Sequence, residues 1–470
     1  MYFHCTVVME QSVIFDQKLL DRYDRPGPRY TSYPSAVQFH DLDEDLYRKV
    51  VRESNGDPIP SPLSLYLHVP FCNTVCYYCG CNKVITANRQ RAIPYLENLQ
   101  REIRLQGSLF DPDRQVEQLH FGGGTPTYLS NEQLSELMDV IAENFNLHED
   151  DLGEYSIEID PRSVDEHTIH LLRLLGFNRI SFGVQDFDPD VQKAVNRIQS
   201  FEQSRDVINA ARAAEFLSIN IDLIYGLPLQ TTASFARTLE RVIELDPDRI
   251  AIYNYAHLPH LFKSQKQINA DDLPPPQEKL NILQLAIHEL TGAGYIYIGM
   301  DHFAKPDNEL AVAQRNGELY RNFQGYSTHA RCDVVGLGVT AIGKVANIYC
   351  QNRKTLDEYA AEIRQDHIPV FRGFTLDYDD QLRSDVISQL ICNFDLSMSM
   401  LEDIYRIDFK SYFSEEITSL KQMQNDGLVE IQEDRIRVLP AGRLLIRNIC
   451  TVFDRYLHGK ENPGNFSKLI

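Results

Sequence analysis

The feature that most constrains the fold is a regular alternation of short β-branched segments with segments of helical periodicity. Six segments have the length and composition of strands, at residues 63–69, 116–121, 155–159, 179–184, 217–226 and 249–256. The stretches between them, such as 93–106, 131–144 and 164–175, carry apolar residues at helical spacing. Strands that alternate with helices are typical of a parallel sheet with crossover helices. Six such units suit a complete or partial barrel, and we expect an α/β fold with a partial (β/α)6 TIM-like barrel.

Changes of pattern along the 470 residues predict three segments. Residues 1–55 are polar and irregular and are expected to form an N-terminal arm, residues 56–365 the barrel domain, and residues 366–470 a mostly helical C-terminal domain. The last segment has helical patterns at 378–394, 397–406 and 411–425, then a hairpin pattern at 428–438 and a helix at 441–457. Helices followed by a small hairpin predict a winged-helix-like module.

The charge of the chain limits its partners. Lys and Arg total 46 and Asp and Glu total 67, so the formal net charge is −21. Such an acidic balance argues against binding to nucleic acid or to an anionic membrane. No apolar run approaches the roughly 18 residues that span a bilayer. We therefore expect a cytoplasmic protein with neither a nucleic-acid nor a membrane partner. We also expect the protein to be a monomer.

Four of the nine cysteines crowd between residues 72 and 81. A secreted disulfide framework would spread its cysteines, so this crowding favours a reducing compartment. Cys72, Cys76 and Cys79 have the spacing C-x3-C-x2-C and follow a predicted strand. Three thiolates on a cubane leave one iron open to a small molecule, which suits catalysis. Zinc and free buried cysteines are the alternatives; zinc would prefer paired C-x2-C halves, and the sequence has no second pair. The spacing favours an iron–sulfur cluster.

These cysteines stand within a wider pattern that resembles a known family. C-x3-C-x2-C after the first strand of a β/α barrel resembles the signature of radical S-adenosylmethionine enzymes. More specifically, the chain resembles the oxygen-independent coproporphyrinogen III dehydrogenases, often called oxidases, of bacterial haem synthesis. The resembling segments cover nearly the whole chain: RYTSYP (29–34), LYLHVPFCNTVCYYCGCNK (65–83), LHFGGGTPTYL (119–129), SIEIDPR (156–162), SFGVQDF (181–187), NIDLIYGLP (220–228), NYAHLP (254–259), GMDHFA (299–304), RNFQGY (321–326) and LICNF (390–394).

The resemblance implies the cofactors and their contacts. It implies a [4Fe–4S] cluster on Cys72, Cys76 and Cys79, and two S-adenosylmethionine molecules per active site. For the cluster-bound molecule it implies contacts from Tyr66, Gly123, Glu158 and Ile342. For the second molecule it implies contacts from Tyr78, Gly124, Thr125, Gln185, Arg197, Asp222 and Ala256. Tyr78 stands where the family commonly has Phe.

The residue types at these positions suit such ligands, although each has a plainer interpretation. Glycines at 122–124 let the backbone approach a ligand, but a triple glycine is often only a turn. Glu158 and Asp222 end predicted strands, where barrel sites collect functional groups, and a carboxylate there can accept bonds from ribose hydroxyls. Arg197 can pair with a ligand carboxylate. Solvated charges or ion pairs within the chain are the alternatives.

Three residues are expected to act near the reacting atoms. Tyr66 and His68 share one face of the first strand, so His68 is placed to tune the cluster or donate to a ligand. A lone strand histidine is otherwise a core residue. Cys81 completes a C-x-C with Cys79; the resemblance implies that it is important without being a cluster ligand, and packing beside the cluster is its plainer role.

The implied reaction is the oxidative decarboxylation of the ring A and ring B propionates of coproporphyrinogen III to vinyl groups, which gives protoporphyrinogen IX. An electron donor and an electron acceptor are needed, and the sequence identifies neither. The four propionates need local positive charge, for which the arm offers Arg22, Arg25 and Arg29, and the later segments His302, Lys305 and Arg321. The rival functions are a cluster-containing haem chaperone, a structural iron–sulfur or zinc protein, and a related radical enzyme acting on haem. Cys81 and the RYTSYP segment argue against the chaperone.

Overall fold

The computed structural model describes residues 13–23 and 25–457. The chain divides into two compact units. The barrel unit comprises Phe39–Ala286 and Arg331–Thr375, and the C-terminal unit comprises Met1–Gln38, Ile287–Ala330 and Leu376–Ile470. This division follows contacts and not chain order, since two separate segments make one unit and three make the other. The sequence-based limits at 1–55, 56–365 and 366–470 stay a prediction.

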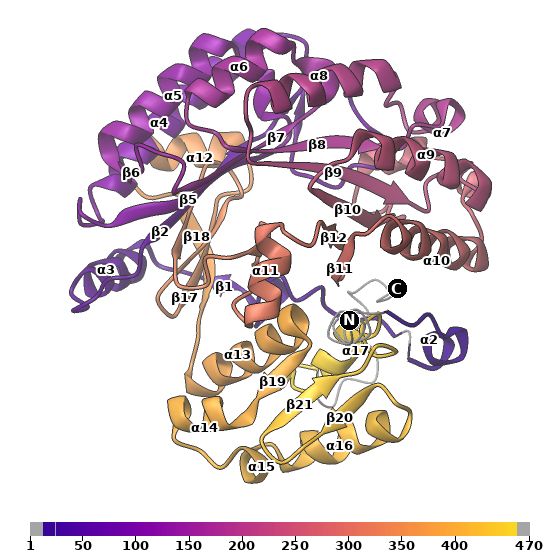
Figure 1. Cartoon of the computed structure of the whole chain (residues 1–470). Helices are drawn as coiled ribbons and strands as arrows, with labels where there is room; N and C mark the ends of the chain where they lie inside the picture. Colours follow the sequence, from indigo (N-terminus) through magenta and orange to yellow (C-terminus); the bar gives the residue numbers. More distant parts are fainter. Residues whose placement is uncertain (1–12, 24, 458–470) are drawn as a thin grey trace. The chain divides into compact units, whose positions relative to one another are not determined.

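Six neighbouring parallel strands form the centre of the barrel unit. In spatial order they are β2 (Leu63–Val69), β5 (Gln115–Gly123), β7 (Glu154–Ile159), β8 (Arg179–Gln185), β9 (Ser218–Tyr225) and β10 (Arg249–Asn254). Helices α4 (Ile93–Gly107), α5 (Asn131–Asn144), α6 (Glu166–Leu174), α8 (Phe201–Ala213) and α9 (Thr232–Leu245) connect them and cover one face of the sheet (Figure 1). The predicted partial (β/α)6 barrel is confirmed.

Local sequence signals explain these elements. In β2, Leu65 and Leu67 are fully buried, as expected for a strand of a parallel sheet covered by helices. Helix α5 begins after Ser130, whose side chain accepts from the Gln133 amide while the Gln133 side chain accepts from the Ser130 amide. This capping box satisfies two backbone donors at the helix start. The helix then buries its apolar stripe, which includes Leu134, against the barrel.

The sheet continues beyond β2. Strand β15 (Asp333–Leu337) lies parallel to β2, and an antiparallel extension follows it through β16 (Ile342–Val345), β17 (Ile348–Asn352), β18 (Val370–Thr375) and β1 (His40–Asp41). Residues 44–55, expected as part of an irregular arm, form helix α3 (Glu44–Asn55) instead. Asp43 caps this helix, and Tyr47, Val50 and Val51 are buried at helical spacing. The sequence interpretation missed this stripe because polar residues surround it.

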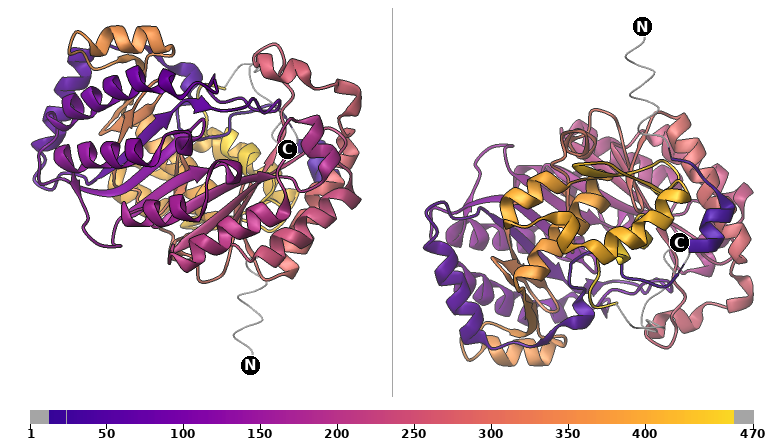
Figure 2. Two further views of the ribbon diagram at one scale, coloured as in Figure 1. Left: turned by 90° about the horizontal axis from the view of Figure 1, so that it is seen from above. Right: turned by 90° about the horizontal axis from the view of Figure 1, so that it is seen from below.

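The C-terminal unit contains the expected helices and small hairpin. Helices α13 (Tyr378–Asn393), α14 (Met398–Tyr405) and α16 (Ser414–Asn425) accompany a three-stranded sheet. The order of its strands is β19 (Asp395–Ser397), β21 (Arg435–Val438) and β20 (Val429–Ile431) (Figure 1). The right-hand view of Figure 2 shows the orange and yellow helices of this unit from below. The arm contributes α2 (Gln17–Tyr23) to this unit. Within the described residues, no helix is both long enough and apolar enough to cross a membrane.

The helix predicted at 441–457 is wrong in extent. The structure has only the short helix α17 (Ile446–Thr451) in this region. The reason is the tight turn before it, where the Gly442 amide donates to the Leu439 carbonyl. Gly442 packs so closely on the Leu428 carbonyl that any side chain at this position would collide with it. The backbone contact therefore holds Gly442 in a turn and delays the start of the helix.

Candidate functional site

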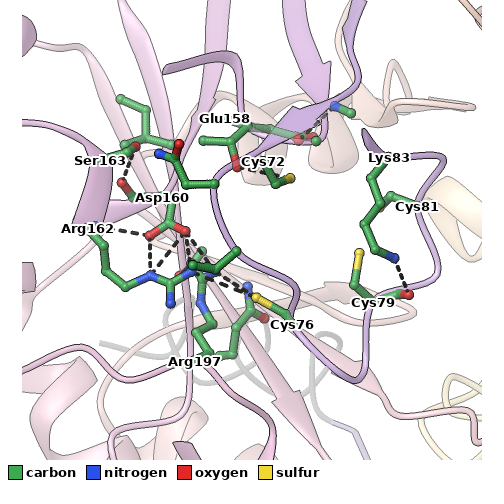
Figure 3. Close-up of a pocket in the computed structure, with 18 of the residues that line it drawn as sticks. Cys72, Cys76, Cys79, Cys81, Lys83, Glu158, Asp160, Arg162, Ser163 and Arg197 are labelled. Carbon is green, nitrogen blue, oxygen red and sulfur yellow. Dashed lines mark hydrogen bonds and ion pairs between the residues drawn. The ribbon is translucent and has the colours of Figure 1, made fainter. Parts of the chain in front are cut away.

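A cavity of about 360 Å³ opens in the barrel unit at the carboxyl ends of the parallel strands. Its walls come from the loop after β2 and from the ends of β5, β7, β8 and β9. All parallel strands end at the same edge of the sheet, which is where barrel enzymes place their functional groups. Figure 3 shows the cysteines of the loop facing the polar side chains of the strand ends.

Four cysteines of the loop line this cavity. Cys72, Cys76, Cys79 and Cys81 all carry free thiols, and none forms a disulfide. The Thr125 hydroxyl lies 3.5 Å from the Cys72 sulfur. A hydrogen bond from Cys81 lowers the pKa of Cys79 to about 6, whereas burial raises the pKa of Cys72 to about 11. Soft sulfur donors on one short loop, beside an open cavity, suit a metal cluster better than a disulfide.

Two glycines of the segment 122–124 allow the end of β5 to approach this loop. Gly123 has φ +111°, and a β-carbon there would lie 2.6 Å from the His68 ring. A β-carbon on Gly124 would lie 2.7 Å from the Pro70 carbonyl carbon. The Gly124 amide donates to Val69 at 2.8 Å, and the Thr125 amide donates to Phe71 at 2.9 Å. The glycines thus bring β5 against the chain that leads into the cysteine loop.

A carboxylate, Glu158 near the end of β7, faces the cavity with two donors behind it. His120 Nε2 lies 3.3 Å from one carboxylate oxygen, and the Gly123 amide lies 3.3 Å from the other. His120 Nδ1 contacts the Ser156 hydroxyl at 2.6 Å, which fixes the ring. Burial alone would raise the pKa of Glu158, but these hydrogen bonds outweigh it and lower that pKa. Glu158 is therefore held ionised as an acceptor.

A second carboxylate, Asp222 on β9, lines the same cavity. The Ser181 hydroxyl donates to it at 2.9 Å, and the Asn220 amide donates at 2.8 Å. Burial raises the pKa of Asp222 to about 6, with the nearby charge of Glu158 contributing. Asp222 is thus mostly ionised at neutral pH and becomes protonated in mild acid.

Two arginines and one aspartate form a charged group on the wall near Cys76. Asp160 accepts from Arg162 Nη2 at 2.6 Å and from Arg197 Nη1 at 3.0 Å. Arg197 also donates to the Gly183 carbonyl, and its buried Nε has no hydrogen-bond partner among the described residues. Burial would lower the pKa of Arg197, but its neighbours, among them the Asp160 carboxylate, raise it. The pair of guanidiniums therefore stays charged.

The predicted catalytic pair lies just behind the cavity. The Tyr66 hydroxyl is 3.1 Å from His68 Nδ1, and His68 Nε2 is 3.1 Å from the Asn82 carbonyl. The Tyr66 ring stacks on His120 with their centroids 5.8 Å apart. Burial lowers the pKa of His68, so its ring is neutral at pH 7. A neutral His68 donates to Asn82 through Nε2 and accepts from Tyr66.

The structure brings most of the predicted site residues to one cavity. The lining contains Cys72, Cys76, Tyr78, Cys79, Cys81, Gly123, Gly124, Thr125, Glu158, Gln185, Arg197 and Asp222. Four others lie outside the lining. Tyr66 and His68 are described above, and Ala256 follows β10, where its carbonyl accepts from Gln265. Ile342 on β16 packs against Gly336, which pairs with Tyr66 across β15 and β2.

The chain was compared with known proteins. Residues 66–242 match the family model of the radical SAM superfamily, and residues 376–445 match that of the HemN C-terminal domain. The chain is 51% identical over 463 residues to the oxygen-independent coproporphyrinogen III oxidase of Pseudomonas aeruginosa, covering 98% of this chain and 100% of that protein. It is 48% identical to the Escherichia coli protein of the same name, covering 98% and 99%.

A solved structure agrees with these sequence comparisons. The E. coli coproporphyrinogen III oxidase, described as a radical SAM enzyme, matches with a TM-score of 0.90 at 48% identity. The match covers 95% of this chain and 100% of that one. The chain belongs to the oxygen-independent coproporphyrinogen III oxidase family. The predicted membership of the radical S-adenosylmethionine enzymes is confirmed, and with it the α/β fold.

Membership of the coproporphyrinogen III oxidase family implies a [4Fe–4S] cluster and S-adenosylmethionine, and the residues present fit both. Three thiols with the radical enzyme spacing enter one cavity, and their sulfur atoms form no disulfide. Opposite them stand ionised carboxylates and guanidiniums, the groups that bind hydroxyls, amines and carboxylates. In the part of the chain that the structure describes, Arg197 Nε is a buried donor without a partner, as expected where a ligand supplies one.

Three residues that line the cavity, Asp160, Arg162 and Ser181, and one beside it, His120, were not singled out from the sequence. His120, Asp160, Arg162 and Ser181 all contact residues that were. A signal was present: residues that alternate along a strand share one face, so Ser156, Glu158 and Asp160 point the same way. The SIEIDPR segment (156–162) of this chain was therefore sufficient to predict that Asp160 faces the same side as Glu158. The pairing of β5 with β7, which sets His120 beside Ser156, is a register that one sequence does not show.

Proposed function

We propose that the chain converts coproporphyrinogen III to protoporphyrinogen IX by oxidative decarboxylation of the ring A and ring B propionates. The observation that carries this proposal is the single cavity in which three free thiols face paired carboxylates and guanidiniums. It lies in a chain that matches the P. aeruginosa oxygen-independent coproporphyrinogen III oxidase over that protein's whole length.

The reaction balances without molecular oxygen. Each propionate loses a hydrogen atom from its β-carbon, then one electron and carbon dioxide, which leaves a vinyl group. When bound, the cluster supplies the electron that cleaves S-adenosylmethionine to a 5′-deoxyadenosyl radical, the acceptor of that hydrogen atom. Since two propionates react, two molecules of S-adenosylmethionine are consumed for each product. An external donor supplies the electron for cleavage, and an external acceptor takes the electron from the substrate.

In this proposal the chain holds and orients the reactants. Cys72, Cys76 and Cys79 hold the cluster. Glu158 accepts bonds from hydroxyl or amino groups of the first S-adenosylmethionine, because its own donors keep it ionised and fixed. The other contacts proposed for that molecule come from Tyr66, Gly123 and Ile342. Those for the second molecule come from Tyr78, Gly124, Thr125, Gln185, Arg197, Asp222 and Ala256.

Two further roles complete the proposal. Arg197 supplies a donor to the carboxylate of the second S-adenosylmethionine through Nε, for which residues 13–23 and 25–457 offer no hydrogen-bond partner. His68 and Cys81 act near the cluster, His68 as a neutral donor and acceptor between Tyr66 and Asn82. We place the enzyme in the cytoplasm as a monomer.

The test uses the reconstituted full chain. Iron and sulfide are added without oxygen, then reductant, S-adenosylmethionine, coproporphyrinogen III and an electron acceptor from cell extract. We expect a product lighter by two formic acid equivalents (two CO2 and two H2) by mass spectrometry, with two 5′-deoxyadenosines formed. Cys76→Ser should lose both products, whereas Cys350→Ala, which changes a buried cysteine on β17 outside the cavity, should keep them.

Other outcomes would replace this proposal. Deoxyadenosine without decarboxylation would keep the radical chemistry and move the substrate elsewhere, as for an enzyme that acts on haem. An intact cluster with neither product, together with tight haem binding, would make the chain a haem chaperone.

A further inference from the structure

Two guanidiniums point at the sulfur of one cysteine of the cavity. Arg197 Nη1 lies 3.5 Å from the Cys76 sulfur, and Arg162 Nη2 lies 3.8 Å from it. Both are within hydrogen-bonding distance for a sulfur acceptor. Arg162 belongs to the turn after β7 and Arg197 to the segment after α7 (Pro189–Ala194). Figure 3 shows both side chains on the same side of the cavity, reaching toward Cys76.

Asp160 holds the two guanidiniums in place. It accepts from Arg162 through Nε at 2.9 Å and Nη2 at 2.6 Å, and from Arg197 Nη1 at 3.0 Å. The side chains of Asp160 and Arg197 are about nine-tenths buried, with 12% and 8% exposure. A planar guanidinium bound at two points keeps its orientation. Two positive charges and one negative charge leave a net charge of +1 beside Cys76.

The other two candidate ligands have different neighbours. The Cys72 sulfur receives a neutral hydroxyl, that of Thr125, at 3.5 Å. The Cys79 thiol has a hydrogen bond with Cys81, and the Lys83 ammonium, which donates at 2.7 Å to the Cys79 carbonyl, also lowers the pKa of this thiol through its charge and a side-chain hydrogen bond. Cys76 therefore has two guanidinium donors at its sulfur, whereas Cys79 has one ammonium and Cys72 a neutral hydroxyl.

We propose that Arg162, together with Arg197, raises the reduction potential of the cluster that Cys76 would hold. The proposal rests on the proposed function for the presence of the cluster. One electron enters the cluster on reduction, so its negative charge grows by one. Nearby positive charge and N–H donors to a ligating sulfur stabilise the more negative state, which raises the potential. Arg162 acts through Cys76 and is a positioning residue, making the cluster easier for a donor to reduce.

The test measures potential without substrate or turnover. The full chain and its variants are reconstituted anaerobically and titrated with dithionite and redox mediators, with the reduced cluster followed by electron paramagnetic resonance. Arg162→Gln removes one charge and should shift the midpoint potential to a more negative value. Arg162→Lys keeps the charge on a flexible stem and should lie between Arg162→Gln and the unchanged protein.

The test also includes a variant that should shift the midpoint potential in the opposite direction and a matched control. Asp160→Asn removes the negative charge from the same group and should shift the potential to a more positive value. Arg173→Gln breaks a pair of similar length, 2.5 Å to Asp151, outside the cavity and should leave the potential unchanged. A purely structural role would move Arg162→Gln and Asp160→Asn in the same direction.

The outcomes decide between these accounts. An unchanged potential in Arg162→Gln that binds a full complement of iron would overturn the proposal, as would a shift of equal sign in Asp160→Asn. If Arg162→Gln does not hold iron, the midpoint potentials of Arg162→Lys and Asp160→Asn are compared instead. Shifts of opposite sign support the proposal, and shifts of the same sign overturn it. If the protein holds a cluster but does not decarboxylate its substrate, the proposed function fails while the potential is still measured.

Discussion

Gly123 lies so close to His68 that no side chain fits between them. A β-carbon on Gly123 would come within 2.6 Å of Cε1 and 2.7 Å of Nδ1 of the imidazole. The ring cannot easily move away, because Tyr66 and the Asn82 carbonyl bond both its nitrogens. The glycine thus sets the distance between the end of β5 and the strand that carries the cysteine loop.

Gly123→Ala should therefore lower stability and iron binding together. A positive φ costs an alanine about 1–2 kcal/mol, and the clash with the ring adds about 1–3 kcal/mol. We expect reduced iron and sulfide content after reconstitution, measured by colorimetric assay, and a lower melting temperature. Gly292→Ala is the control, since nothing lies within 4 Å of its β-carbon position. Full iron loading in Gly123→Ala would contradict this account of the glycine.

His120 should affect the binding of S-adenosylmethionine through Glu158. A hydrogen bond to a charged group contributes about 1.5–3 kcal/mol, so His120→Gln should weaken binding of S-adenosylmethionine by up to roughly 10- to 150-fold. Without His120 the pKa of Glu158 rises, so binding should begin to fail at a higher pH than in the unchanged protein. Isothermal titration between pH 5 and 8 measures both effects. His170→Gln, which alters an exposed histidine near Glu166, should change neither.

Glu102 on α4 should make stability depend on pH. It is fully buried and accepts from the Tyr359 hydroxyl, the Asn352 amide and the Gly338 amide. Burial raises its pKa from 4.5 to about 7. The folded protein then holds a proton that the unfolded chain releases, so this stabilisation is complete below about pH 4.5 and is lost as pH rises through 7.

The Glu102→Gln variant lacks this titration. In the unchanged protein, the free energy of unfolding that Glu102 contributes falls by roughly 3 kcal/mol as the pH rises from 4.5 through 7. The stability of the unchanged protein should therefore fall relative to that of the variant between pH 5 and 8. Chemical denaturation at four pH values gives the difference. Glu97→Gln, an exposed change on the same helix, serves as control. A constant difference between the unchanged protein and Glu102→Gln would show that Glu102 does not titrate in this range.

The N-terminal arm offers a test of substrate binding. Arg22 pairs with Asp426 at 2.8 Å, and Tyr30 donates to Asp454 at 3.0 Å, so these residues anchor the arm to the C-terminal unit. Arg25 is exposed and has no ion pair among the described residues. If it meets a propionate, Arg25→Gln should raise KM for coproporphyrinogen III several-fold and leave kcat and S-adenosylmethionine affinity unchanged. Steady-state kinetics would contradict this role by showing an unchanged KM.

Deleting residues 1–35 is the harsher form of the same test. Turnover should be abolished while the absorption of the cluster survives, because the cluster cysteines belong to the barrel unit. Residues 1–12 and Asp24 lie outside the described part of the chain. Persistent turnover by the shortened chain would show that the arm takes no part in catalysis.

Much of the barrel could be predicted because each strand and helix has its own local signal. The predicted strand at 63–69 coincides with β2, and the predicted helix at 131–144 coincides with α5. Helix α3 was missed because its apolar stripe is short, and helix 441–457 was overextended because Gly442 is held by a distant backbone contact.

The site, too, has one part that the sequence predicts from local spacing and another that depends on contacts between distant segments. The cysteine loop was predictable from spacing within ten residues. The His120–Glu158 contact and the Asp160 group depend on the register between strands and on segments far apart in the sequence. A single sequence has no pattern that encodes such pairings, so those residues were found only in three dimensions.

The most direct test of the central claim follows a hydrogen atom from substrate to cofactor. Coproporphyrinogen III that carries deuterium at the β-carbons of its ring A and ring B propionates is incubated with the reconstituted, reduced protein, S-adenosylmethionine and an electron acceptor from cell extract. The account predicts 5′-deoxyadenosine with one deuterium per molecule and a divinyl product that has lost two carboxyl groups. Unlabelled 5′-deoxyadenosine beside intact coproporphyrinogen would contradict it.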